Sequence, residues 1–323
     1  MHFVTLIKEK ILYGSTITKN EALMLFSQPL EELCQNANEI RKHYCQNTFD
    51  ICTIINAKSG RCSENCKYCA QSIHHDADCQ DYPLLSADEI ISHAKYNADR
   101  GVQRYSLVTS GKTLVEQELE QICSVVEQMK TSVPIEICGS FGLLTKEQYT
   151  RLYQVGLTRI HNNLETSKNN FPNMCTTHTF EDKVTAIGFA KEVGMYICSG
   201  GIFGIGESLE DRIDLAFSLK ALNVKSVPIN VLNPIKGTPY ENLQPLSEDE
   251  IRRIVAVYRF ILPCAFIRLA GGRNLLHDKG RSCFLSGANA AISGDMLTTS
   301  GFSIEADLKM IAELGFEVKK NHG

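Results

Sequence analysis

Three closely spaced cysteines are the residues of this sequence with the clearest chemistry. Cys62, Cys66 and Cys69 stand in a C-x3-C-x2-C pattern within a polar stretch, RCSENCKYCAQS, at residues 61–72. Three thiolates at this spacing can bind three irons of a [4Fe–4S] cluster and leave the fourth iron without a protein ligand. Zinc sites usually pair two C-x2-C units or add histidines instead. The pattern therefore predicts a cluster whose open iron binds a small chelating molecule.

An aromatic residue, Tyr68, stands directly before the last of these cysteines. In this respect the stretch resembles the radical S-adenosylmethionine (SAM) superfamily. The resemblance implies that the open iron binds the amino and carboxylate groups of SAM, and that Tyr68 lies near the adenine.

The elements that must position this loop follow an alternating pattern. From Ile51 onward, β-branched runs alternate with amphipathic stretches, which predicts a parallel sheet covered by helices. The expected strands are residues 51–56, 103–109, 134–138, 158–163, 195–199, 226–231, 265–269 and 288–292. The expected helices begin near Ser86, Val115, Thr145, Thr179, Glu207 and Ser247, with capping boxes at Ser86, Thr145 and Ser247. Eight such units predict an α/β fold, a (β/α)8 TIM-type barrel. The segment between the last two strands is too rich in glycine to predict a helix there.

The N-terminal residues 1–50 are expected to form a helical cap on this barrel. Thr18 and Glu21 form a capping box, and a second helical stretch runs from about Leu30 to Tyr44. No linker divides the chain, so residues 51–323 are expected to form the barrel within a single domain overall.

Composition narrows the possible partners and the compartment. The chain has 323 residues, 43% of them hydrophobic, and a formal net charge of −4. This balance gives no reason to expect nucleic acid or an anionic membrane as a partner, and no apolar run is long enough to span a bilayer. The N-terminus is charged where a signal peptide needs apolar residues, which predicts a cytoplasmic protein.

The 13 cysteines are expected to be reduced thiols and metal ligands rather than disulfides. Seven of them are expected to be small buried or half-buried apolar residues without a function: Cys34, Cys45, Cys79, Cys123, Cys175, Cys264 and Cys283.

Barrel enzymes carry their chemistry at the C-terminal ends of the strands, and the cluster loop follows the first strand directly. Side-chain alternation predicts which other residues face the barrel interior. On the third strand, Cys138 shares a face with Glu136. On the fourth, one face carries His161, Asn163 and Glu165. Cys198 lies on the fifth strand and Arg268 on the seventh. Each has a simpler structural interpretation on its own, since a strand cysteine is more often part of the core. Charged and amide groups gathered inside one barrel nevertheless exceed what a core requires.

Taken together, the motifs resemble the biotin synthase family, over about residues 18–317. They are CSENCKYCAQS at 62–72, NNLETS at 162–167, CTTHT at 175–179, CSGGI at 198–202, GIGE at 204–207, VPIN at 227–230, KGTP at 236–239 and IRLAGGR at 267–273. The resemblance implies that dethiobiotin gains one sulfur between two unactivated carbons. Cleavage of SAM yields a 5′-deoxyadenosyl radical that removes hydrogen from the substrate, and the sulfur comes from a second iron–sulfur cluster. A second SAM repeats the step and closes the ring.

The resemblance also implies roles for individual residues, motif by motif. Cys138, Cys198 and Arg268 match ligands of the auxiliary cluster, a [2Fe–2S] cluster or a variant of it. Asn163 and Glu165 match groups that hold the SAM ribose and the neighbouring substrate. The residues that match the remaining SAM and substrate contacts are Lys183 for the SAM carboxylate, Gly200, Gly201 and Ile202 for the nucleoside, and Asn230 for the ureido ring of dethiobiotin. An electron donor such as flavodoxin or ferredoxin, and a homodimer, are implied as well.

Two positions depart from the family pattern. Ser106 replaces a cysteine on the second strand, and His161 replaces an asparagine on the fourth, where it is expected to contact substrate. A serine hydroxyl is a poor iron ligand because it gives up its proton less readily than a thiol. Cys52, early in the first strand, is the candidate for the missing ligand; the alternative is a small core cysteine.

Two other functions compete with sulfur insertion. One is a different radical SAM enzyme on the same scaffold, such as a hydrogenase-maturation enzyme or a different sulfur inserter. A maturase has no need of an interior sulfur-donor cluster, so Cys138, Cys198 and Arg268 argue against it. The other is a non-catalytic iron–sulfur carrier, against which the open iron inside a complete barrel argues.

Overall fold

A closed parallel barrel forms the body of the protein. The computed structural model describes residues 2–294 and 301–318. The strands that form the barrel are β1 (Thr48–Lys58), β2 (Arg104–Thr109), β3 (Glu136–Ser140), β4 (Arg159–His161), β5 (Tyr196–Cys198), β6 (Gly201–Phe203), β7 (Ser226–Val231), β8 (Phe266–Leu269) and β9 (Ala290–Ile292). All their pairings are parallel, β1 pairs with both β2 and β9, and β5 and β6 share one position beside β7. The predicted (β/α)8 barrel is therefore confirmed.

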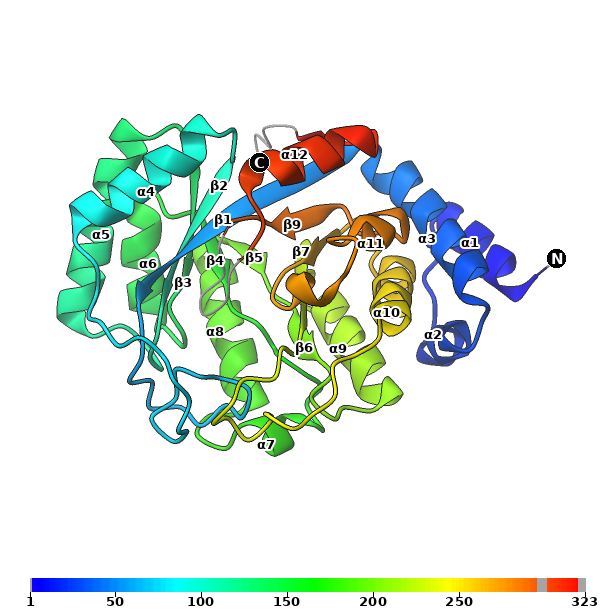
Figure 1. Ribbon diagram of the computed structural model, residues 1–323, viewed down its shortest axis with the longest axis horizontal. Coiled ribbons are helices and arrows are strands. Elements are labelled where there is room, and N and C mark those ends of the chain that lie inside the picture. Colours follow the sequence, from blue (N-terminus) through cyan, green and yellow to red (C-terminus); the bar gives the residue numbers. More distant parts are fainter. Residues whose placement is uncertain (1, 295–300, 319–323) are drawn as a thin grey trace.

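Helices cover the outside of the barrel, as Figure 1 shows. They are α4 (Ala87–Asp99), α5 (Glu116–Ser132), α6 (Lys146–Gln154), α8 (Phe180–Val193), α9 (Leu209–Ala221) and α10 (Glu248–Ile261), with the one-turn α7 (Phe171–Met174) before α8. The expected capping boxes are present at Ser86, Thr145 and Ser247. Between β8 and β9 the chain forms only the short η1 (Arg273–Leu275) and α11 (Arg281–Leu285), in keeping with its glycine content.

Three N-terminal helices pack against the outside of the barrel. They are α1 (Phe3–Leu12), α2 (Lys19–Phe26) and α3 (Leu30–Cys45); α2 begins at the expected Thr18 capping box. In Figure 1 they lie beside α10. Arg253 of α10 donates to the carbonyls of Phe26 (2.9 Å) and Gln28 (2.6 Å), which fixes the connection between α2 and α3. The division into a cap and a barrel stays a prediction; β1 begins at Thr48.

Beyond the barrel, α12 (Ile304–Glu313) leads into β10 (Glu317–Val318), which pairs in parallel with the start of β1. None of the helices described here has both the length and the hydropathy to cross a membrane.

Candidate active site

The cysteine loop lies at the C-terminal end of β1, where barrel enzymes place their chemistry. The loop folds back on itself: the Cys62 amide donates to Gln71 O (2.9 Å), the Ile73 amide to Cys62 O (2.9 Å), and the Cys69 amide to Cys66 O (3.0 Å). These bonds gather Cys62, Cys66 and Cys69 in one small, partly exposed loop. Burial and the neighbouring Cys62 raise the pKa of Cys69 to about 11. Such a thiol becomes a thiolate when a metal binds it.

A cavity of about 350 Å³ runs through the barrel interior beside this loop. Tyr68 lines it, so the cluster loop and the cavity share a wall. Burial and the nearby Glu165 raise the pKa of the Tyr68 hydroxyl, which keeps it neutral. His161, Asn163 and Glu165 line the same cavity, which confirms that their side chains face the barrel interior.

Asn163 connects the ends of two neighbouring strands. Its Nδ2 donates to Glu165 Oε2 (3.3 Å), and its Oδ1 accepts from the Gly200 amide (2.9 Å). Glu165 itself has a left-handed backbone, with φ of 68°. Such a conformation is costly for a residue with a side chain, and it is found mainly where the surrounding structure holds it in place.

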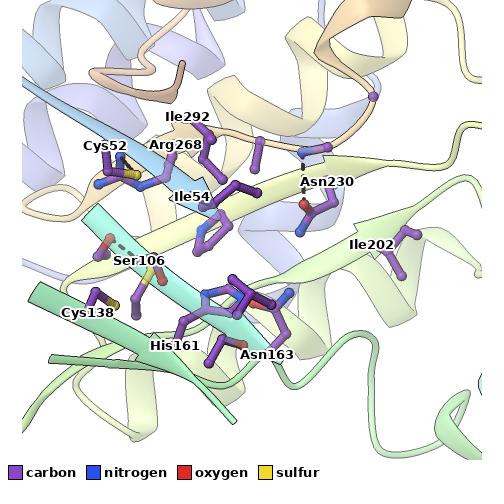
Figure 2. A pocket seen from close by; sticks show the side chains of 18 of the residues that line it. Cys52, Ile54, Ser106, Cys138, His161, Asn163, Ile202, Asn230, Arg268 and Ile292 are labelled. Atoms are coloured by element: carbon purple, nitrogen blue, oxygen red, sulfur yellow. Dashed lines mark hydrogen bonds between the residues drawn. The ribbon is translucent and has the colours of Figure 1, made fainter. Parts of the chain in front are cut away.

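Three cysteines and one arginine meet deeper in the cavity, as Figure 2 shows for Cys52, Cys138 and Arg268. Cys198 lines the same part of the wall. The guanidinium Nη1 of Arg268 donates to Cys52 Sγ at 3.1 Å, whereas its Nε is buried and has no hydrogen-bond partner among the described residues. Buried donors normally have acceptors. An anionic group between these thiols would supply the missing one.

These thiols differ in how readily they ionise. Burial raises the pKa of Cys138 to about 12. Burial also opposes ionisation of Cys198, but a hydrogen bond from His161 and the charge of Arg268 outweigh it and lower the pKa to about 7. Cys198 also lies 3.3 Å from the Ser226 hydroxyl, and Ser106 hydrogen-bonds Cys138. His161 therefore contacts a thiol of this group, and its predicted contact with substrate stays a prediction.

Ion pairs form the floor of the cavity below these thiols; Asp50, Arg104 and Arg268 are buried in it, and Glu136 is partly exposed. Asp50 accepts from Arg104 (2.5 Å) and pairs with Arg268, and Glu136 pairs with Arg104 (2.8 Å) and Arg159 (3.5 Å). With three guanidinium groups against two carboxylates, this floor has a net positive charge. It therefore favours anionic thiolates above it.

Comparison with known proteins agrees with this arrangement. A family model described as Radical SAM superfamily matches residues 57–219, and one described as Biotin and Thiamin Synthesis associated domain matches residues 228–317. Biotin synthase of Brachyspira hyodysenteriae is 56% identical over 313 residues, covering 97% of this chain and 94% of the relative. This chain belongs to the biotin synthase family. Biotin synthase of Akkermansia muciniphila is 51% identical and covers 99% of both chains.

Solved structures share the fold of this biotin synthase family member. Methylornithine synthase (PylB) superposes with a TM-score of 0.83 at 19% identity, over 97% of both chains. HydG, a maturase of the [FeFe]-hydrogenase, gives 0.85 at 18% identity, over 98% of this chain and 75% of its own. At these identities the likeness shows the fold alone.

Some residues expected from the biotin synthase family pattern have other contacts in the structure. Lys183 Nζ donates to Asn162 Oδ1 (3.2 Å) and is not among the residues that line the cavity. Gly200 and Gly201 are packed against neighbouring strands: a Cβ at Gly200 would lie 2.0 Å from Pro228 O, and one at Gly201 would lie 2.3 Å from Glu165 O. Backbone crowding is thus one reason for glycine here. The expected contact with the nucleoside stays a prediction; Ile202 does line the cavity.

One irregularity interrupts β1: the register shifts between Asn56 and Lys58, and Lys58 pairs with Glu118 of α5 (2.6 Å). One expectation about a single residue was wrong. Cys264 was expected to be at least half-buried and is exposed.

Sequence reasoning also missed the surroundings of Cys175, which had been assigned to the apolar cysteines. Cys175 is buried, but its Sγ lies 3.4 Å from His178 Nδ1 and 3.4 Å from Asn65 Oδ1, and it contacts Cys66. The hydrogen bond from Cys66 is the main reason that its pKa falls to about 3. The CTTHT motif was the available signal, because it places a thiol three residues before an imidazole.

We expect Asp50 to stabilise the fold more than an exposed carboxylate does. Burial alone would raise its pKa, but Arg268 and Arg104 outweigh that effect and hold the pKa well below the usual range. Asp50→Asn leaves both guanidinium groups buried without that anion, so the free energy of unfolding should fall by about 3–5 kcal/mol. The stabilisation is present above the ordinary Asp pKa of about 3.9 and is lost as the pH falls below it.

Denaturant unfolding of preparations matched for iron content measures this loss. Asp249→Asn is the control: Asp249 pairs with Arg252 at 3.6 Å on the surface, and its loss should cost no more than about 1 kcal/mol. Equal losses of unfolding free energy in the two variants would contradict a stabilising role for the ion pairs of Asp50.

Proposed function

We propose that this chain is a biotin synthase, which inserts sulfur into dethiobiotin by radical SAM chemistry. The observation that supports this most is the shape of the site. The cysteine loop borders one end of the barrel cavity, and a second group of thiols with an arginine lines its depth. A radical generator and a sulfur donor on opposite sides of one substrate are what this reaction needs.

The residues at both ends fit the groups that this proposal assigns to them. Cys62, Cys66 and Cys69 would hold the [4Fe–4S] cluster and leave one iron for SAM. That cluster would supply the electron for SAM cleavage. Chemistry of this kind is needed because unactivated C–H bonds are beyond side-chain acids and bases. The deeper thiols with Arg268 would hold the auxiliary cluster, and the unpartnered Arg268 Nε and the positive floor suit an anionic sulfide-containing group.

The protein's own contribution is to hold the substrates and exclude water. The continuous barrel wall separates a reactive radical from solvent. Glu165 and Asn163 present a carboxylate and an amide at the cavity wall, which suit the vicinal hydroxyls of a ribose. Lys183 is proposed to contact the SAM carboxylate, for which its ammonium would have to leave Asn162.

Cys52 is proposed as the third thiol ligand of the auxiliary cluster, in place of Ser106. The Cys52 thiol lies beside Arg268, and its electrostatic partners include Cys198. Burial raises its pKa, as it does for Cys138, so metal binding would have to deprotonate it. Whether this cluster is a [2Fe–2S] cluster or a variant follows from counting its iron.

Further features of the proposal come from the family. They are an electron donor such as flavodoxin or ferredoxin, a homodimer, and a cytoplasmic location. A hydrogenase-maturation enzyme remains the alternative. Its support is likeness of fold alone, and the interior thiols do not favour it over a biotin synthase.

The test is an anaerobic assay of the reconstituted protein with dethiobiotin, SAM and a reductant. Biotin should form, with two molecules of 5′-deoxyadenosine for each biotin. Mössbauer spectra with iron and sulfide analysis should find two clusters per chain. SAM cleavage without any sulfur insertion, in protein that holds both clusters, would contradict the proposal.

Asn230 is proposed to contact the ureido ring of dethiobiotin. Its Nδ2 donates to Gly201 O (3.0 Å) and its Oδ1 accepts from the Gly271 amide (2.9 Å), which leaves one N–H and one lone pair for a ligand. Asn230→Ala should cost about 1–3 kcal/mol of dethiobiotin binding, roughly a 5- to 150-fold rise in dissociation constant. The affinity for SAM should change less and serves as the internal control. An unchanged dethiobiotin affinity would place the substrate elsewhere.

A further inference from the structure

Cys175 gives the cysteine loop a fourth thiol and an imidazole. The Sγ atoms of Cys66 and Cys175 and a ring nitrogen of His178 all lie within 4.8 Å of one another. Cys175 and His178 are buried, with 2% and 8% of their surfaces exposed, whereas Cys66 is partly exposed. Two sulfurs and a nitrogen thus lie close together in a largely buried group.

Two loops hold this arrangement in place through Asn65. The Asn65 Oδ1 atom accepts a hydrogen bond from the backbone amide of Thr176 (2.9 Å). The backbone amide of Asn65 donates to Thr177 Oγ1 (3.1 Å). The Lys67 amide donates to Met174 O at 3.0 Å. These hydrogen bonds join the two loops on either side of Cys66 and Cys175. They hold the two thiols close to each other.

The Glu64 carboxylate lies against the imidazole of this group. Its Oε2 lies 2.5 Å from His178 Nδ1, the nitrogen that also faces Cys175, and 2.8 Å from Thr177 Oγ1. His178 Nε2 is buried without a hydrogen-bond partner in the described part of the chain. Two thiolates and an imidazole are ligands that a tetrahedral Zn²⁺ site uses, and a water molecule can take its fourth position.

We propose that the cluster-free chain binds one soft divalent cation of the Zn²⁺ class through Cys66, Cys175 and His178. The Glu64 carboxylate contacts the His178 ring and would orient it. This ion and the [4Fe–4S] cluster exclude each other, because both require the Cys66 thiolate; this second part rests on the proposed function. Bound metal would hold the two loops together, with their thiols ligated, until the cluster replaces it.

Cobalt titration of the full-length chain tests the site. The protein is prepared anaerobically without iron and titrated with Co²⁺, whose absorption reports thiolate ligands and tetrahedral geometry. The wild type should bind one tightly held Co²⁺ that Zn²⁺ displaces. Cys175→Ser and His178→Gln should lose this tight binding, and Glu64→Gln should weaken it by about 10- to 100-fold as an adjacent partner.

Cys69→Ser is the matched control, since it removes a thiol of the same loop and should leave the site intact. Circular dichroism checks that each variant is folded; Cys175→Val, which fills the buried position, replaces Cys175→Ser if the serine variant unfolds. If Cys69→Ser abolished binding while the Cys175 and His178 variants kept it, the ion would lie in the cysteine loop and the proposal would be wrong.

Cluster assembly tests the exclusion separately from sulfur insertion. Iron and sulfide are added to the apoprotein with and without one equivalent of Zn²⁺, and the cluster is followed by its visible absorption. Zn²⁺ should slow assembly in the wild type and have little effect in Cys175→Ser. Equal slowing in both proteins would overturn the exclusion, whereas a failure of biotin formation alone would leave this result standing and count against the proposed function.

Discussion

Changing Cys62, Cys66 or Cys69 to alanine should abolish the cleavage of SAM. Each variant leaves the proposed [4Fe–4S] cluster with two of its three cysteines from the motif and a labile iron. The measurement is 5′-deoxyadenosine formation under anaerobic, reducing conditions, together with the iron content of each variant.

The control is Cys123→Ala. Cys123 is a half-buried cysteine of α5, outside the barrel interior, so its variant should keep both iron and activity. Wild-type rates of 5′-deoxyadenosine formation in any of the three loop variants would remove the basis for assigning the cluster to them.

Cys52→Ala should abolish biotin formation while leaving SAM cleavage at the first cluster intact. The thiol contacts Arg268 in the depth of the cavity, far along β1 from the cysteine loop. Loss of one ligand should therefore affect the auxiliary cluster and not the radical generator. Biotin and 5′-deoxyadenosine measured in the same reactions separate the two effects.

Cys283→Ala provides a matched control for the lost volume. Cys283 is also buried, but it lies in α11, and its variant should retain sulfur insertion. If Cys52→Ala inserted sulfur as well as Cys283→Ala does, Cys52 would be a packing residue and the third ligand would have to be sought on another strand.

The strands and the cysteine loop could be predicted because their signals are local. Alternation of apolar runs and capping residues is readable within a few residues, and C-x3-C-x2-C lies in a single loop. The extension of the fifth strand into β6 was not predicted. It depends on the pairing of Gly201–Phe203 with β7, a contact with a distant segment that no local pattern records.

The polar groups at the two ends of the cavity were harder to predict for the same reason. Asp50 and Arg104 stand at or near the starts of their strands, where charged residues are normally exposed. Their burial follows only from closure of the barrel, which brings Arg268 to Asp50 from 218 residues away. Likewise, the thiol of Cys175 meets the cysteine loop across 110 residues.

The eleven-residue strand β1 connects both ends of the site. Cys52 lies near its start and the cysteine loop follows its end. A single strand therefore separates the two proposed clusters. From Cys52 to Lys58 the strand advances by about 20 Å. A residue inserted in this segment would lengthen the gap and turn Cys52 out of the cavity. Under the proposed function, the length of this strand would set the spacing between the two clusters, and with it the size of substrate that fits between them.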